Sequence, residues 1–486
     1  MWPMRLWTKP VAHHLSRPGG VRRTLKIPNP IPYFGCSKLM SDNWPALSLH
    51  MEQERLSATR PFSPRGCPRA IMSRYGLSER SRLRALKRRG YKYLLKADLS
   101  QFYPTLYTHS IPWALHSKAA SKSVLKNKAK TKSLGDNIDL FHMYMNDGQT
   151  HGIAIGPDIS HITAEIVMAA VDQQLLHRYR SQICGFRYID DFELSFETLS
   201  EAETVLGGLQ SILSTFELSL NSRKTQIVDL PLGLEDRWAI DLNKFVIRNK
   251  KSPSGQRNDF ISYFSTAFER ASTDPASPIL RYALARVQNE NVDPKGWGAF
   301  CNCVLGAISA DASTLPAALA TLHKVATKGG HSIPKGPLGQ VLNSVISKHS
   351  ITGDGNEVAW ALWASLAWSI PISAEAAKTL GLMEDDIVAI LALDAESSGL
   401  IDANVLDKHA WSLLLNEDDA HIAEHWLLSY EATKRRWLSC SAVKNCTTFS
   451  EMMNAGVSFY SRRRNNPDEL LKIGSIPGGR LPNFYA

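Results

Sequence analysis

Two adjacent aspartates, Asp190 and Asp191, lie between apolar and aromatic residues in the stretch GFRYIDDFELSF (185–196). The alternation on either side of them predicts a strand, a tight turn and a second strand, with the acids at the tip of a hairpin. A third acid, Asp98, ends the apolar run YKYLLKAD. Carboxylates at such strand ends can hold two Mg²⁺ ions about 4 Å apart, the arrangement that two-metal phosphoryl transfer requires.

The elements that must position these acids occupy the first half of the chain. The sequence predicts a strand within 91–103, a long helix over 159–180 and an amphipathic helix over 199–221. Strand-like and helix-like segments alternate in this way up to the polar stretch IRNKKSPSGQRN (247–258), which is typical of a linker or loop. The pattern indicates an α+β fold.

After this stretch nearly every segment has a helical pattern, with short Gly, Pro and Asp turns between segments. Paired helices of this size favour an irregular α-solenoid of HEAT-like units, although no strict repeat period is visible. We therefore expect an α+β part at 1–246, a connecting segment at 247–275 and an all-α part with a tail at 276–486.

Charge narrows the class of partner. The net charge of +10 is uneven, because residues 1–135 carry 26 Lys and Arg against five Asp and Glu, whereas the rest carries 30 against 41. A basic N-terminal third favours a polyanionic partner such as nucleic acid, since each neutralised phosphate releases counterions. For the run RSRLRALKRRG (80–90) alone, a solvated basic face is an equally good interpretation.

A membrane and a metal-binding cysteine site are not expected. The sequence has no run of about 18 uninterrupted apolar residues and no apolar secretory segment at its N-terminus, which predicts a cytoplasmic protein. Its seven cysteines include no CxxC pair. His109 and His116 lack the companions of a zinc site and are assigned to packing or hydrogen bonding.

Four motifs in order resemble those of reverse transcriptases. YIDD (188–191) resembles the YxDD box, and DLSQFYP (98–104) resembles the first carboxylate motif, with an aromatic residue five positions after the aspartate. GIAIGPDISHITAEI (152–166) resembles the loop and helix that follow template and incoming nucleotide, and LNSRKTQIV (220–228) resembles the lysine motif. The resemblance implies a right-hand polymerase core of palm and fingers over about residues 20–246.

The resemblance extends to the bacterial abortive-infection and unknown-group enzymes, often called defence-associated reverse transcriptases. It is carried by 23–44, 103–118 and 154–167. Members of this class have a HEAT-like helical domain where a polymerase thumb would usually be. The class implies a bacterial, cytoplasmic protein of antiphage defence that forms a homo-oligomer, a trimer or a hexamer.

The resemblance also implies roles for single residues. Asp98, Asp190 and Asp191 would hold two Mg²⁺ ions, with Mn²⁺ as an alternative, Asp98 and Asp190 most directly. Tyr103 would lie under the sugar of the incoming dNTP and exclude a 2′-hydroxyl. Lys224 would face the triphosphate, where it would neutralise charge or protonate the leaving pyrophosphate.

A second group of residues would line the substrate. Gly152, Gly156 and Pro157 would shape a loop against nucleotide or template, because glycine permits close backbone approach. Familiar reverse transcriptases often have a polar residue before the first glycine and Ser-Pro later, whereas this sequence has His151-Gly152 and then Gly156-Pro157. This departure predicts unusual template handling. Arg69 is a candidate phosphate contact of the fingers, and a solvated surface arginine is an equally good interpretation.

The class includes members that prime from a protein hydroxyl and members that depend on a noncoding RNA, and the sequence leaves both open. Tyr485, in the Gly/Pro-rich tail 473–486, is a candidate attachment site, and Tyr460 is the next. A tail that packs on a neighbouring subunit or lacks order is the alternative.

The sequence therefore predicts an RNA-directed DNA polymerase, a nucleotidyltransferase that takes dNTPs, binds an RNA template or structured noncoding RNA, and makes DNA. One alternative is a catalytically silent RNA-binding scaffold, against which the three intact acids count. Another is a mobile-element reverse transcriptase, against which the acidic, helix-rich C-terminal half counts.

Overall fold

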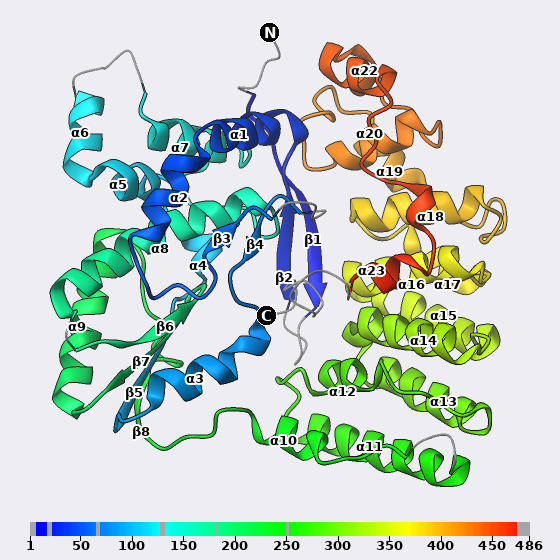
Figure 1. Cartoon of the computed structure of the whole chain (residues 1–486). Coiled ribbons are helices and arrows are strands. Elements are labelled where there is room, and N and C mark those ends of the chain that lie inside the picture. The colour runs from blue at the N-terminus through cyan, green and yellow to red at the C-terminus, as the bar shows by residue number, and fades with distance from the viewer. Residues whose placement is uncertain are drawn as a thin grey trace. The chain divides into compact units, whose positions relative to one another are not determined.

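The computed structural model divides into two compact units, and each is described by itself. The mixed unit, named for its strands and helices, comprises residues 1–10 and 26–234. The helical unit comprises residues 11–25 and 235–486. Figure 1 labels the elements of both units. The structure describes residues 6–16, 22–64, 69–126, 132–180, 182–248 and 252–473.

A four-stranded sheet of order β6-β7-β5-β8 carries the predicted acids in the mixed unit. The predicted hairpin is confirmed, because β6 and β7 are antiparallel neighbours. The next strand, β5, pairs antiparallel with both β7 and β8, and its register places Asp98 opposite Asp191. The strands are β5 (Tyr93–Asp98), β6 (Cys184–Tyr188), β7 (Asp191–Phe196) and β8 (Gln226–Asp229).

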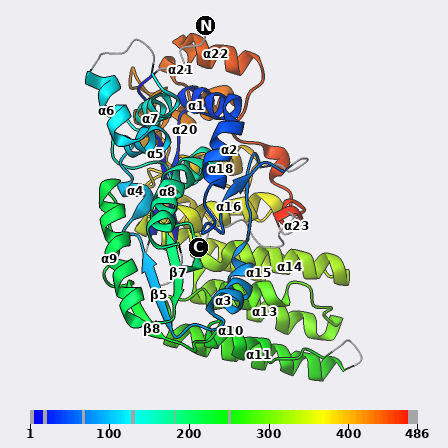
Figure 2. The ribbon, with the colours of Figure 1, turned by 60° about the vertical axis from the view of Figure 1, so that its left-hand side comes forward.

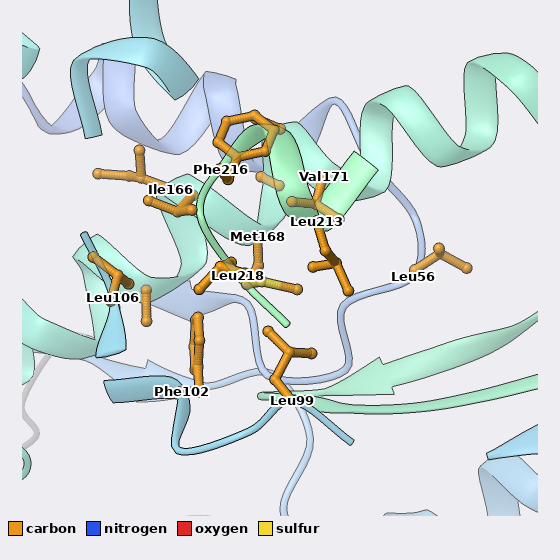
Figure 3. Close-up of a cluster of buried hydrophobic side chains, with 14 of the residues drawn as sticks. Leu56, Leu99, Phe102, Leu106, Ile166, Met168, Val171, Leu213, Phe216 and Leu218 are labelled. Atoms are coloured by element: carbon orange, nitrogen blue, oxygen red, sulfur yellow. The ribbon is translucent and has the colours of Figure 1, made fainter. Parts of the chain in front are cut away.

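Two long helices pack beside this sheet, and both confirm the sequence-based prediction. Helix α9 (Leu199–Thr215) contacts β5, β7 and β8, and begins at a capping box formed by Thr198 and Glu201. Helix α8 (Asp158–Tyr179) packs against α9 and is apolar on most of its faces because most of it is buried. Figure 3 shows part of the shared core, with Leu56, Leu99, Phe102, Leu106, Ile166, Met168, Val171, Leu213, Phe216 and Leu218 labelled.

Shorter elements complete the mixed unit. A two-stranded antiparallel ribbon, β3–β4, lies between α2 and α3 in the chain. The elements are α1 (Pro30–Asp42), α2 (Trp44–Glu52), β3 (Pro61–Phe62), β4 (Met72–Ser73), α3 (Arg80–Arg88), α4 (Phe102–Thr105), α5 (Ser110–His116), α6 (Lys118–Lys126) and α7 (Leu134–Tyr144).

The helical unit is a two-layered stack of helices, which confirms the predicted helical repeat domain (Figures 1 and 2). Helices α11, α13, α15 and α17 contact one another in succession, and so do α12, α14, α16, α18 and α20. Helices that contact the next but one in the chain form two layers, as in α-solenoids. No helix in the described ranges combines the length and apolarity that a membrane span requires.

The helices of this unit are α10 (Arg237–Asn243), α11 (Pro253–Thr273), α12 (Ile279–Val287), α13 (Pro294–Ala310), α14 (Leu315–Gly329), α15 (Lys335–Thr352), α16 (Gly355–Trp368), α17 (Ala374–Leu380), α18 (Asp386–Ser397), α19 (His409–Leu414), α20 (Trp426–Lys434), α21 (Ser441–Asn445), α22 (Thr447–Asn454) and α23 (Glu469–Ile473).

The predicted connecting segment at 247–275 is wrong, because most of it is the helix α11. Its polar composition hides an apolar stripe in which Phe260, Tyr263, Phe264 and Ala267 recur at helical spacing and are buried. The division between the units therefore falls earlier than predicted, between residues 234 and 235.

The predicted assignment of residues 11–25 to the first domain is also wrong. Strand β1 (Val11–Ser16) pairs with β2 (Arg22–Ile27) and packs against α16 and α18 of the helical unit. His13 Nδ1 lies 2.8 Å from Asp385 Oδ2, and both side chains are buried. Because these contacts join residues far apart in sequence, local pattern does not reveal them.

Candidate active site

The structure brings the three predicted acids to one edge of the sheet. Asp98 ends β5, Asp191 begins β7 directly opposite it, and Asp190 precedes Asp191 in the turn. The ladder continues past the acids, since the Leu99 N–H donates to the Asp190 carbonyl at 3.3 Å. The strand end and the hairpin tip are thus joined by backbone bonds, which fixes the spacing of the acids.

The side chains of Asp98 and Asp191 start from residues directly opposite each other in the ladder and are close enough to affect each other's ionisation. Burial, against the lowering effect of Arg80, raises the pKa of Asp191, and together with the neighbouring carboxyls of Asp98 and Asp190 it brings this pKa to about 7. Carboxylates this close disfavour simultaneous ionisation unless a cation joins them.

Lys224, the residue of the lysine motif, contacts the first acid, and its predicted role at the triphosphate stays a prediction. Its Nζ lies 3.2 Å from Asp98 Oδ2, and its side chain remains 64% exposed, so it can also meet a ligand from solvent. Asn221, which sequence reasoning missed, donates its backbone N–H to the Asp98 carbonyl at 2.7 Å and its amide to Asp98 Oδ2 at 3.3 Å. The segment after α9 therefore holds Asp98 in place by both backbone and side chain.

The acids have the donor chemistry of a magnesium site. Within the described residues, no three His, Cys, Asp or Glu side chains already converge as a metal cluster. However, Asp98 and Asp191 lie opposite each other and offer only carboxylate oxygens, the hard ligands that Mg²⁺ prefers, and a divalent ion would neutralise the negative charge of the ionised pair. The residues therefore fit a divalent ion held by Asp98, Asp191 and their neighbour Asp190.

Arginines of α3 surround a fourth acid, Glu193, two positions after Asp191 on β7. Arg84 and Arg88 pair with Glu193 at 2.8 and 2.7 Å. Arg80 bridges Asp191 and Glu193 at 3.2 Å to each. Although burial opposes ionisation, the bonds to these arginines lower the pKa of Glu193 to about 2. The i, i+4 spacing of these three arginines predicts that they share one helix face. The sequence does not show that Glu193 is their partner.

A buried ionic network lies under the hairpin turn. Arg187 is fully buried and pairs with Glu165 at 3.0 Å and with Asp172 at 2.8 Å, both from α8. Its Nη1 also donates to the Ile189 carbonyl at 2.7 Å, and Thr59 Oγ1 accepts from the Ile189 N–H at 3.0 Å. Glu165 and Asp172, which interrupt the apolar residues in the middle of α8, are the signal that could have revealed this network.

The network acts on a strained residue. Ile189 has φ +58°, a left-handed conformation that a β-branched side chain rarely adopts. Both of its backbone groups are held by buried side chains, so the surrounding structure maintains the conformation that aims Asp190 and Asp191. Arg187 and Thr59 are positioning residues for the turn.

The glycine loop is joined to the segment that carries Tyr103. The Ile153 N–H donates to the Tyr103 carbonyl at 2.9 Å, and the Tyr103 ring is half-buried beside Phe102. Gly152 has φ +83°, and a Cβ at this position would lie 2.8 Å from the Pro104 carbonyl oxygen. Glycine is therefore required where the loop crosses the Tyr103 helix.

The other two loop residues precede α8. Gly156 has φ +124° with open space at its Cβ position, and Pro157 is the N-cap of α8. The carboxylate of Asp158, at the first position of the helix, forms an ion pair with Arg69. The predicted phosphate contact by Arg69 stays a prediction, and a ligand would have to share this arginine with Asp158.

The two candidate priming residues differ in what the structure says of them. Tyr460 lies in the helical unit, where its hydroxyl donates to Asp394 Oδ2 at 2.5 Å and accepts from the Asn465 amide at 2.6 Å. Burial raises its pKa, and the bond to Asp394 adds to this effect. Tyr485 lies outside the described residues.

Comparison with known proteins identifies the class of the mixed unit. Residues 50–253 match the model of the family described as reverse transcriptase (RNA-dependent DNA polymerase). Residues 50–253 thus form a domain of the reverse transcriptase type. The matched range contains all three acids, Tyr103 and Lys224.

Similar solved structures include two telomerases of 11–12% identity. Telomerase from Candida albicans, in complex with a TWJ fragment of telomeric RNA, is 12% identical with a TM-score of 0.31, covering 70% of this chain and 64% of that one. Apo telomerase from Candida tropicalis is 11% identical with a TM-score of 0.33, covering 80% and 66%. The chain thus spans 64–66% of the length of these two proteins. No curated protein matches the chain.

Proposed function

We propose that the chain is an RNA-directed DNA polymerase whose active site is formed by Asp98, Asp190 and Asp191. The observation that carries this proposal is the register of the sheet, which sets Asp98 opposite Asp191 within a domain that matches reverse transcriptases. The reaction is attack of a 3′-hydroxyl on the α-phosphate of a dNTP, with pyrophosphate as the leaving group.

The chain's own residues divide this work. When bound by the three acids, two Mg²⁺ ions supply Lewis-acid stabilisation of the attacking and leaving oxygens. Lys224, exposed beside Asp98, faces the triphosphate and neutralises or protonates the pyrophosphate. Tyr103 excludes a 2′-hydroxyl from the sugar site. Gly152 lets the loop backbone approach the segment that carries Tyr103, and so shapes the proposed sugar site beside Tyr103.

We further infer that the enzyme acts in bacterial antiphage defence, in the cytoplasm, as a homo-oligomer with a bound RNA as template or partner. Support comes from the resemblance of 23–44 and 154–167 to defence-associated enzymes and from the helical stack after the polymerase domain. Two kinds of primer fit this proposal: the 3′-hydroxyl of a nucleic acid, or a tyrosine hydroxyl, for which Tyr485 is the first candidate and Tyr460 the second. For Tyr460, the bond to Asp394 would have to break first.

Labelling of the purified full-length protein tests the polymerase and its primer. The protein, with its associated nucleic acid, is incubated with Mg²⁺ and each labelled dNTP, then run on denaturing gels before and after protease. Asp190→Ala abolishes labelling, whereas Asp229→Ala, an exposed acid at the far end of the β5–β8 pair, retains it. Equal labelling of wild type and Asp190→Ala would refute the proposed active site.

The same gels identify the primer. Label that stays on the protein until protease treatment, and is lost in Tyr485→Phe or Tyr460→Phe, supports protein priming. Free labelled DNA points to a nucleic-acid primer. Defence is tested separately, by phage plating on cells that express wild type or Asp98→Asn. Equal plating on both strains, with wild type active in vitro, would reject the defence role and leave the polymerase in place.

A further inference from the structure

The mixed unit contains a basic pocket that the proposed chemistry does not use. It has a volume of about 520 Å³ and lies among the loop after α2, the C-terminal end of α8 and the start of β6. Four of its lining residues are basic: Arg55, Lys87, His177 and Arg180. No Asp or Glu is among its lining residues in the described part of the chain.

Within the described residues, these four basic side chains have no ion-pair or hydrogen-bond partner, unlike their neighbours. Arg84 and Arg88 flank Lys87 on α3 and are both committed to Glu193, but Lys87 has no acidic partner among the described residues. The same holds for Arg55, although Glu54 precedes it: the Glu54 carboxylate is turned inward and accepts the N–H groups of Leu56 and Ser57.

Unpaired cations gathered around one cavity repel one another, which weakens the fold unless an anion joins them. The remaining lining includes the apolar side chains of Leu56, Leu176 and Ile183 and the amides of Gln53 and Gln173. The side-chain N–H of Gln173 donates to the His50 carbonyl at 3.1 Å. Its amide oxygen can therefore accept a hydrogen bond from a ligand. The cations could bind the phosphate of a nucleotide, the apolar wall could pack against its base, and the amide oxygen could accept a hydrogen bond from an exocyclic amine of the base.

We propose that this pocket binds a nucleotide through its phosphate, as a free nucleotide or as one unit of an RNA strand. The pocket is distinct from the catalytic edge. Cys184 lines it at the start of β6, whereas Asp190 lies in the turn beyond the other end of this strand, which spans about 13 Å at the usual rise. A ligand here can remain bound while the active site takes primer and dNTP.

Binding of the full-length protein to two probes tests the site and distinguishes the sources. One probe is a short labelled single-stranded RNA and the other is labelled ATP, each titrated over a range of salt concentrations. The test variant is Arg55→Gln with Arg180→Gln. The matched control is Arg89→Gln with Arg178→Gln, which removes the same charge from exposed residues that do not line the pocket.

The test variant is expected to weaken binding about tenfold or more and to reduce the salt slope by about 2, one for each lost phosphate contact, while the control changes neither. Loss of RNA binding alone identifies a strand, and loss of ATP binding identifies a free nucleotide. Equal behaviour of the two variants, or no binding of either probe to wild type, overturns the proposal. Because binding is measured without synthesis, these outcomes are independent of Asp190→Ala and of the proposed polymerase activity.

Discussion

Arg187 donates a 2.7 Å hydrogen bond to the carbonyl of Ile189, the residue that turns the chain towards Asp190 and Asp191. The same guanidinium is fully buried between Glu165 and Asp172. One side chain therefore links the long helix α8 to the geometry of the turn, and the positive φ of Ile189 persists because this side chain and Thr59 hold it.

Removal of Arg187 should damage both stability and activity. Arg187→Met leaves two carboxylates buried without a cation, so we expect a loss of about 3–5 kcal/mol in the free energy of unfolding, measured by urea denaturation. Adding Glu165→Gln and Asp172→Asn should recover most of the stability but not the activity, because the bond to Ile189 stays lost. Full recovery of activity in the triple variant would show that Arg187 does not position the turn.

Arg80 and Arg84 form a matched pair for testing the charge beside Asp191. Both contact Glu193, but only Arg80 also contacts Asp191. Arg80→Gln should lower kcat by between about ten- and a hundredfold through misplacement of Asp191. It should also lower the Mg²⁺ concentration for half-maximal rate, since a nearby positive charge is removed. Arg84→Gln should change neither, and a similar Mg²⁺ shift in both variants would contradict the assignment.

Tyr103 should determine the choice of sugar. Tyr103→Val opens space beside Phe102, so incorporation of ribonucleotides should rise relative to deoxynucleotides by about ten- to a hundredfold, measured as the ratio of kcat/KM values. Tyr107→Val, a half-buried tyrosine packed on Trp113, serves as the control and should leave the ratio unchanged. An unchanged ratio in Tyr103→Val would remove Tyr103 from the sugar site.

His142 should make the stability of the mixed unit depend on pH. Burial lowers its pKa to about 4, although the charge of Asp139 opposes this, and its Nε2 lies 2.8 Å from Thr163 Oγ1. The unfolded chain, with a pKa near 6.5, binds more protons between these values. Its contribution is therefore complete above about pH 6.5 and is lost as pH falls towards 4.

The measurement compares urea denaturation at pH 7 and pH 4.5 for wild type and His142→Gln. The wild type should lose about 2–3 kcal/mol more than the variant over this range. Because the other histidines are common to both proteins, they cancel in the comparison. Equal losses would mean that His142 is protonated in the fold or open to solvent.

The sequence predicts what local pattern determines. The hairpin at 185–196 and the helices α8 and α9 follow from hydrophobic periodicity. Asp98 and Lys224 are found from the order and spacing of the motifs, and the structure brings them into contact. The basic run at 80–90 is a case that local pattern could not predict. Three of its arginines are neither solvated nor free for a polyanion, because they pair with acids that lie more than a hundred positions later.

The same limit applies to the networks and to the unit boundary. Arg187, Glu165 and Thr59 come from three separate segments, and their convergence depends on the packing of α8 against the loop after α2. Helix α11 was hidden by its Ser, Asn and Thr content, since its buried aromatic stripe occupies only one face. Side-chain partners across long sequence separations require the tertiary fold.

The position of β1 in the helical unit has a consequence for how the chain matures. Residues 11–25 and 235–486 form one unit, so the polymerase domain at 26–234 is an insertion within the helical unit. On the ribosome, β1 emerges before the mixed unit but can meet α16 and α18 only after the chain has been synthesised up to Ser397, the end of α18. The helical unit can therefore close only after the polymerase domain has been synthesised.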